Sequence, residues 1–254
     1  MSVGQQALPE VVGLTPLKLV TKPGVERWPV KTGTDLDNAL VGKNIINGQS
    51  LGTGIVDTTV QELILIPRST DMTPPAQLFP AFQERRKGPV ETTVWRLEAD
   101  ITALKQEADG DYHLVLQGAS GETMVAEIPT PHPPFVDASS PWTVNMQVAR
   151  QAIDDKLVSK LNPADFVQVG DMLVPRDSVT ASTAVQPLAM PSLPASFRTP
   201  PEGSNQPMPA FKTQITPTRV RITGVGLFDK VHGQMGVALL NGVELHPILK
   251  IEWL

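Results

Sequence analysis

The chain has 254 residues and a mass of 27.4 kDa, enough for one large domain or two small ones with a buried core. Hydrophobic residues make up 41% and charged residues 19%, which excludes wholesale disorder, and the absence of cysteine excludes disulfides and thiolate chemistry. The net charge of −5 argues against duplex nucleic acid as a partner, because proteins that bind it usually present a basic surface.

The N-terminal part of the chain carries few signals of regular structure. Residues 1–12 lack the basic and apolar regions of a secretion signal, so the cytoplasm is the expected location. No run of about 18 apolar residues occurs anywhere, and we therefore expect no membrane-spanning segment. Residues 1–55 show no sustained hydrophobic period and many turn formers, residues 58–66 could form one short helix or strand, and residues 67–90 are rich in turns. We therefore expect residues 1–90 to be an irregular segment that wraps around the rest.

A clear strand pattern begins after residue 91. Apolar and polar residues alternate over 92–103 and again over 112–117, and a third alternating stretch ends at Pro129. Asp109-Gly110 lies between the first two stretches and is a strong hairpin signal, because both residues tolerate positive φ. The pattern predicts a three-stranded antiparallel meander over 92–129.

One amphipathic helix is expected next, near 141–161. Ser139 or Ser140 can cap it, and Asn162-Pro163 ends it. Five apolar residues recur at helical spacing: Trp142, Met146, Ala149, Ile153 and Leu157. Four charged residues fall on the opposite side, which we expect to face water: Arg150, Asp154, Asp155 and Lys156.

The last part of the chain begins with a long proline-rich stretch and returns to strands. Residues 175–217 include 9 prolines and few charges, so they predict an extended insertion without a core of its own. Alternation resumes at 219–222, and Asn241-Gly242 predicts a hairpin that pairs 236–240 with 243–245.

The order of these elements predicts a fold class. Three strands, a helix and two or three further strands are the layout of a small antiparallel OB-like β-barrel, so the protein should be mainly β. The expected organisation is an irregular N-terminal wrapping segment over 1–90, the barrel over 91–166 and 219–254, and a proline-rich insertion over 167–218.

Several stretches of the sequence resemble a group of small, uncharacterised bacterial proteins. They are EADGDYHLVL at 107–116, TMVAEIP at 123–129, GVGLFD at 224–229, HGQ at 232–234, VELHP at 243–247 and RWPVKTGTD at 27–35. The resemblance covers most of 25–166 and 219–254. It carries no activity with it.

A second, weaker resemblance is to staphylococcal-type thermonucleases, which are OB-fold enzymes that use calcium. It implies metal-ligand positions at Asp111, after an Asp-Gly turn, and at Glu127, near the end of the third strand. The positions that match the catalytic groups of those enzymes differ, because they hold Glu122, Thr130 and Gln234. Phosphodiester cleavage needs cationic groups to stabilise developing charge, so the resemblance does not extend to the catalytic set.

The residues themselves also predict a metal site in the acidic middle third, where 91–166 hold 5 basic and 12 acidic residues. Asp109, Asp111 and His113 alternate around the first hairpin, and Glu127 lies on the adjoining strand. His232 is the expected ligand from the later strands, and His246 is a further imidazole there. Carboxylates suit Ca²⁺, Mg²⁺ or Mn²⁺, and imidazole suits Zn²⁺ or Mn²⁺.

The alternative is a structural role for the same residues. Asp109 would then serve the turn, Asp111 and Glu127 would be solvated, and His113 would pack or form a hydrogen bond.

We therefore expect a non-catalytic binding or scaffold module whose extended segments are ordered by a protein partner or a second copy of the chain. Two alternatives stay open. One is a divalent-metal-dependent phosphodiesterase or nuclease. The other is a single-strand nucleic-acid-binding module, although Trp95 and Tyr112 are expected in the core rather than on a stacking surface.

Overall fold

The structure is a computed structural model. It describes residues 27–43, 45–46, 49–50, 54–72, 80–107, 110–131, 133, 135–170, 172–179, 197–198, 210–229 and 241–254. Among the helices of these ranges, none combines the length and the apolar character that a bilayer crossing needs.

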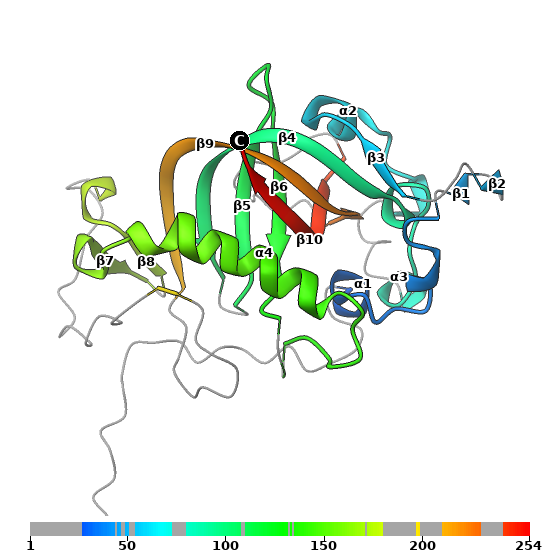
Figure 1. Ribbon diagram of the computed structural model, residues 1–254, viewed down its shortest axis with the longest axis horizontal. Helices are drawn as coiled ribbons and strands as arrows, with labels where there is room; N and C mark the ends of the chain where they lie inside the picture. Colours follow the sequence, from blue (N-terminus) through cyan, green and yellow to red (C-terminus); the bar gives the residue numbers. More distant parts are fainter. Residues whose placement is uncertain are drawn as a thin grey trace, which may run out of the picture.

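An eight-stranded sheet dominates the fold, which confirms that the protein is mainly β (Figure 1). The strand order is β3-β4-β5-β6-β10-β9-β8-β7. The strands are β3 (Ile55–Asp57), β4 (Val94–Gln106), β5 (Tyr112–Gln117), β6 (Thr123–Ile128), β7 (Phe166–Val169), β8 (Met172–Pro175), β9 (Phe211–Phe228) and β10 (Val243–Trp253). Two further short strands, β1 (Ile45–Ile46) and β2 (Gln49–Ser50), pair only with each other.

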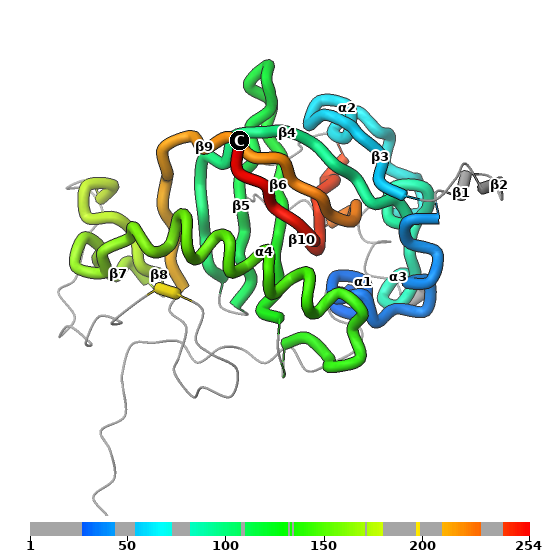
Figure 2. The backbone as a smooth tube through the Cα atoms, in the orientation of Figure 1, coloured from blue at the N-terminus to red at the C-terminus, as the bar shows by residue number. Residues whose placement is uncertain are grey.

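Five of these strands form a closed cycle of hydrogen-bonded neighbours. β4 pairs antiparallel with β5 on one side and with β9 on the other. β5 continues to β6, β6 lies parallel to β10, and β10 returns antiparallel to β9. The smooth trace in Figure 2 follows the long β4 and β9 side by side as they curve around this cycle.

The predicted meander is present as β4, β5 and β6. Leu97, Ala99 and Ile101 are buried in the core, as the alternation in β4 requires. Gly110 has a φ of 90° in the turn between β4 and β5, a conformation that glycine adopts without steric cost. Asp109 lies outside the described residues.

The predicted helix is also present, although it is shorter than expected. α4 (Thr143–Lys156) is followed by a 3₁₀ turn at Val158–Lys160. In Figure 1 it crosses one end of the sheet, and its buried face contributes Met146, Ala149 and Ile153 to the core.

The expectation that Arg150 and Asp154 face water is wrong. Both are buried, because the phenol of Tyr112 donates a 2.5 Å hydrogen bond to Asp154 and the guanidinium of Arg150 lies 3.7 Å from the centre of the Tyr112 ring. Arg150 also donates to the carbonyl of Ile128 at 3.0 Å. A polar stack therefore joins α4 to β5 and β6.

The C-terminal strands differ from the prediction in two ways. β9 starts at Phe211, inside the range assigned to the insertion, and a register shift opposite Ile101–Ala103 accommodates Pro217, which has no N–H for a ladder. The hairpin partner expected at 236–240 lies outside the described residues. Val243 to Leu245 lie instead between β9 and β6, so both of their edges are already paired.

Much of the described part of residues 27–93 lies against the cycle of strands, whereas β1 and β2 stand apart from it. This part of the chain contains α1 (Trp28–Thr32), α2 (Val60–Leu65), α3 (Pro80–Gln83) and 3₁₀ turns at Asn38–Leu40, Thr70–Met72 and Val90–Thr92. β3 joins the main sheet parallel to β4. Further 3₁₀ turns at Pro163–Asp165 and Arg176–Ser178 flank the β7–β8 hairpin.

Two buried ion pairs hold α1 and the segment that follows it. The Arg27 guanidinium donates to both carboxylate oxygens of Glu91 at 2.6 and 2.7 Å, and Arg86 donates to Asp35. Arg27 has a φ of 59°, an unfavourable conformation for a residue other than glycine, which these contacts enforce.

Candidate metal centre

A polar centre lies on the side of the sheet that faces away from the hydrophobic core. On β5, Tyr112 and Leu114 point into the core, so His113 between them points to the opposite side. His113 pairs in register with Glu127 on β6. On β10, Glu244 and His246 alternate in the same way with Leu245, which is part of the core.

The structure brings together three of the five residues that the sequence predicted as ligands. Asp111, His113 and Glu127 lie close together at one end of β5 and β6. The expectation that Asp111 and Glu127 are solvated is wrong, because their residues are only 2% and 8% exposed. Asp109 and His232 lie outside the described residues.

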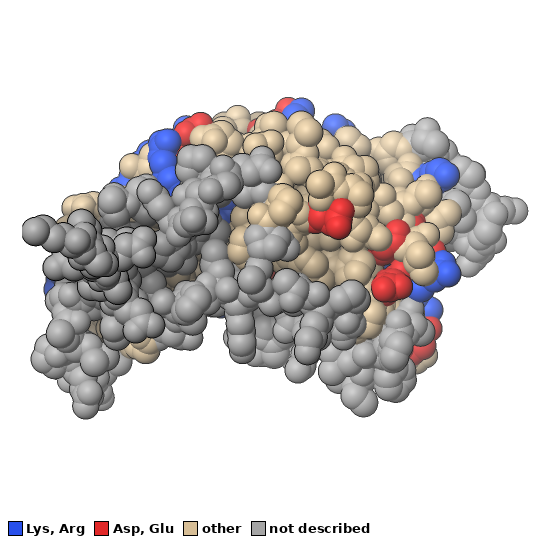
Figure 3. All heavy atoms as spheres, turned by 90° about the horizontal axis from the view of Figure 1, so that it is seen from below, with Lys and Arg blue, Asp and Glu red and all other residues tan. Residues whose placement is uncertain are grey.

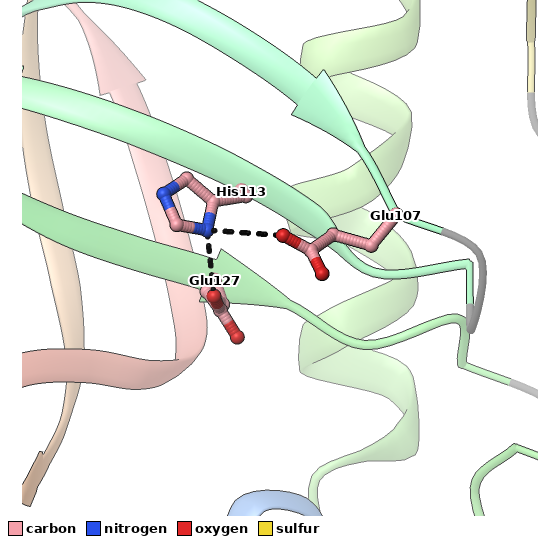
Figure 4. A group of neighbouring side chains, drawn as sticks. All are labelled: Glu107, His113 and Glu127. Carbon is pink, nitrogen blue, oxygen red and sulfur yellow. Dashed lines mark hydrogen bonds and ion pairs between the residues drawn. The ribbon is translucent and has the colours of Figure 1, made fainter. Parts of the chain in front are cut away.

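The carboxylate of Glu127 contacts two imidazoles, those of His113 and His246. One carboxylate oxygen lies 2.8 Å from His113 Nδ1, and the other lies 2.9 Å from His246 Nδ1. Glu107 approaches the same His113 nitrogen at 3.6 Å (Figure 4). Because an ionised carboxylate only accepts hydrogen bonds, Nδ1 of each imidazole is the donor. A neutral ring in this arrangement would carry its proton on Nδ1 and its lone pair on Nε2.

Neighbouring charges push the two buried glutamates in opposite directions. Burial by itself would raise the pKa of Glu127, but the Lys31 ammonium and the hydrogen bonds from His113 and His246 hold it well below its usual value. Burial and repulsion from Glu127 raise the pKa of Glu244 well above its usual value. Glu127 is therefore ionised at neutral pH, whereas burial and the charge of Glu127 favour the neutral form of Glu244 more than in an exposed glutamate.

His246 carries the most unusual atom of the centre. The residue is fully buried, and no described residue gives its Nε2 atom a hydrogen bond. Asp111 Oδ2 lies 3.8 Å from this atom, which is too far for a hydrogen bond. One oxygen each from Asp111 and Glu127 and one nitrogen from His246 lie within 4.8 Å of one another.

Among the described ion pairs of the centre, those of Lys31 are the ones that involve an ammonium group. Its Nζ lies 3.9 Å from a carboxylate oxygen of Glu127 and 3.9 Å from one of Asp229. Burial opposes its charge, but Asp229, Glu127, Glu244 and Asp111 together raise the pKa of Lys31 well above its usual value. Lys31 thus contacts two of these carboxylates directly and is influenced by the other two.

The sequence prediction missed Glu244 and Lys31 and did not place His246 among the ligands. The sequence did carry a signal for Glu244 and His246. In VELHP they alternate with apolar residues and so share one side of a strand. Lys31 gave no signal, because nothing in the pattern of residues 27–35 shows which surface α1 covers.

No known family model, curated protein or solved structure matches the chain. The resemblances drawn from its sequence stretches therefore remain predictions. The function has to be argued from the geometry of the centre.

Proposed function

We propose that the protein is a non-catalytic metal-binding module built on an OB-type barrel. The cycle β4-β5-β6-β10-β9, with α4 between its third and fourth strands in chain order, supports the OB assignment, because an OB fold is a five-stranded barrel of this kind. The side of such barrels formed by their second and third strands is a common ligand-binding surface. Here these strands are β5 and β6, which carry His113 and Glu127.

The charge of the centre supports a bound cation. Asp111, Glu127, Glu244 and Asp229 all raise the pKa of Lys31 against the effect of burial, and the Arg68 guanidinium also interacts with Asp229 and Glu244. Several buried carboxyl groups are thus gathered in one place. Buried charges of this kind are costly unless they are paired or coordinate a metal.

A single observation carries the proposal, namely the position of the His246 Nε2 atom. Nδ1 of His246 is directed at Glu127, so its Nε2 atom is directed toward a carboxylate oxygen of Asp111 at 3.8 Å, beyond hydrogen-bond distance. With a neutral ring, a divalent cation between these two atoms would satisfy both of them. Metal–ligand bonds of about 2.1 Å span this separation, and a carboxylate behind the ligating imidazole is the usual way to orient it.

The mixed donor set favours a borderline divalent ion. Imidazole nitrogen and carboxylate oxygen suit Mn²⁺ or Zn²⁺, and His246 and Asp111 would hold it directly while Glu127 orients the His246 ring. Ca²⁺ takes six to eight oxygen ligands and suits this centre less well. Because all three residues are buried, the metal would have a structural or regulatory role.

Two features argue against the nuclease and nucleic-acid alternatives. The described ion pairs of the centre use Lys31 and histidines, and no arginine takes part in them. A surface hollow of about 690 Å³ beside β4 and β9 does hold arginines, but Arg96 is paired with Asp57 and Arg221 with Glu98. On the face shown in Figure 3, the described basic side chains lie toward the edges and form no continuous patch.

Thermal unfolding in chelator and in excess Mn²⁺ or Zn²⁺ tests the proposal. Binding to the folded state at about 100 times the dissociation constant adds about 2.7 kcal/mol, so either metal should raise the melting temperature by several degrees. Asp111→Asn and His246→Gln should each abolish this rise. Asp137→Asn, the same change on an exposed loop, should retain it. A melting curve of the unmodified protein that neither ion shifts would refute the proposal.

A further inference from the structure

Lys31 is held over the centre by the local structure of α1. The helix is a single turn that ends at Gly33, where φ is 78° and an added Cβ would come within 2.4 Å of the Trp142 ring. The residue is only 8% exposed. Its ammonium is therefore confined beside Glu127 and Asp229.

The contacts of this ammonium are electrostatic and loose. Both distances to carboxylate oxygens are 3.9 Å, longer than a hydrogen bond. The oxygen of Glu127 that faces Lys31 is the same one that accepts the Nδ1 proton of His246. The ammonium and the imidazole ligand of the proposed metal thus share one carboxylate.

The anchors of α1 do not involve the Lys31 side chain. Trp28 donates its indole N–H to the carbonyl of Phe135 at 2.6 Å, and the hydroxyl of Ser140 donates to the carbonyl of Thr32 at 2.6 Å. The Arg27 pair with Glu91 holds the other end. The position of α1 therefore does not depend on the contacts of the Lys31 ammonium.

We infer that Lys31 is a built-in competitor for the metal, so that its ammonium and the divalent cation are alternative counter-charges for the same buried carboxylates. This inference rests on the proposed function. A monovalent ammonium neutralises part of the negative charge when the metal is absent. A divalent ion within a few ångströms repels it, and in a buried site such repulsion is weakly screened. Lys31 thereby sets the metal affinity of the centre.

Substitution of Lys31 by methionine separates this role from a purely structural one. Without metal, Lys31→Met should melt at a lower temperature than the unmodified protein, because the carboxylates lose their counter-charge. Its affinity for Mn²⁺ or Zn²⁺, measured by isothermal titration calorimetry on the full chain, should be at least tenfold higher. Lys250→Met removes the same charge from an exposed strand position and should change the affinity by less than twofold.

The outcomes of this titration distinguish the two proposals. If the unmodified protein binds the metal and Lys31→Met binds it equally or more weakly, the competitor role is wrong and the metal centre stands. If neither protein binds, the proposed function fails and the competitor role fails with it.

A second measurement on the unmodified protein covers the case in which Lys31→Met does not fold. Acylation by a water-soluble amine reagent, read by mass spectrometry, should label Lys31 at least threefold faster with saturating metal than with chelator. Lys250 provides the internal reference and should not change. Equal labelling of Lys31 in both conditions would overturn the inference.

Discussion

Glu127 organises the centre at the scale of single residues. It accepts hydrogen bonds from His113 and His246 and is one of the two carboxylates nearest Lys31. Against the effect of burial, Lys31 and the two imidazoles lower the pKa of this carboxylate, whereas burial and repulsion from Glu127 raise the pKa of Glu244. The two neighbouring glutamates therefore differ in how readily they take up a proton.

The Glu244→Gln variant tests whether the pKa of Glu244 is raised in the folded protein, through the pH dependence of stability. The folded-state pKa of Glu244 is raised, so from about pH 4.5 upward the folded protein holds a proton that the unfolded chain has lost. The stability of the unmodified protein therefore falls as pH rises through this window, by up to about 1.4 kcal/mol per pH unit. The variant lacks this titration, so its stability relative to the unmodified protein should rise with pH.

Urea unfolding in chelator between pH 4.5 and 8 measures the difference. Glu84→Gln, on an exposed side chain, is the matched control and should show no comparable trend. A stability difference between Glu244→Gln and the unmodified protein that stays constant across this range would show that Glu244 is ionised in the folded state.

The sequence predicts part of this centre because strand alternation is a local property. Asp111, His113 and Glu127 lie on consecutive strands, and period-2 alternation with one hairpin places them together. His246 comes from β10, whose parallel pairing with β6 joins strands distant in the chain. Local patterns do not encode such a pairing. Lys31 comes from α1, whose position depends on tertiary contacts alone.

At the scale of elements, the link between α1 and the strands depends on a buried ion pair rather than on apolar packing. Glu91 is fully buried and accepts bonds from the Arg27 guanidinium and from the backbone N–H of Phe228 at the end of β9. It thus connects the start of α1 with the cycle of strands. A carboxylate at this place compensates an arginine that would otherwise be buried without a counter-charge.

Glu91→Gln should therefore destabilise the protein by about 3–5 kcal/mol, since removal of one partner leaves the Arg27 charge uncompensated in the interior. The measurement is urea unfolding at pH 7, with Glu84→Gln again as the control. A loss below about 1 kcal/mol would mean that Arg27 finds water or another acceptor, and that the pair does not fasten α1.

Some elements of the fold can be predicted from local sequence patterns and others cannot. β4, β5, β6 and α4 follow from alternation, turn residues and helical spacing, and each is found where it was expected. The N-terminal part of β9 was missed because Pro217 interrupts the pattern, although a register shift lets the strand continue. The polar side of α4 was misjudged, since only the tertiary fold places Tyr112 beneath Arg150 and Asp154.

At the scale of the whole molecule, the cycle of strands separates an apolar core from a buried group of ionisable side chains. Apolar side chains from β4, β5, β6, β9 and β10 fill one side together with α4. On the other side, ionisable groups of β5, β6 and β10 are buried with Lys31 of α1. A purely structural interface would bury fewer charges, because desolvation of each one is costly. This arrangement is why we assign a cation to the buried group of ionisable side chains.

Anomalous diffraction from crystals grown with saturating Mn²⁺ or Zn²⁺ tests this claim most directly. The account predicts an anomalous peak about 2.1 Å from His246 Nε2 and a similar distance from a carboxylate oxygen of Asp111, with Glu127 still bonded to His246 Nδ1. Crystals with no peak between His246 and Asp111, and with another group hydrogen-bonded to His246 Nε2, would contradict it.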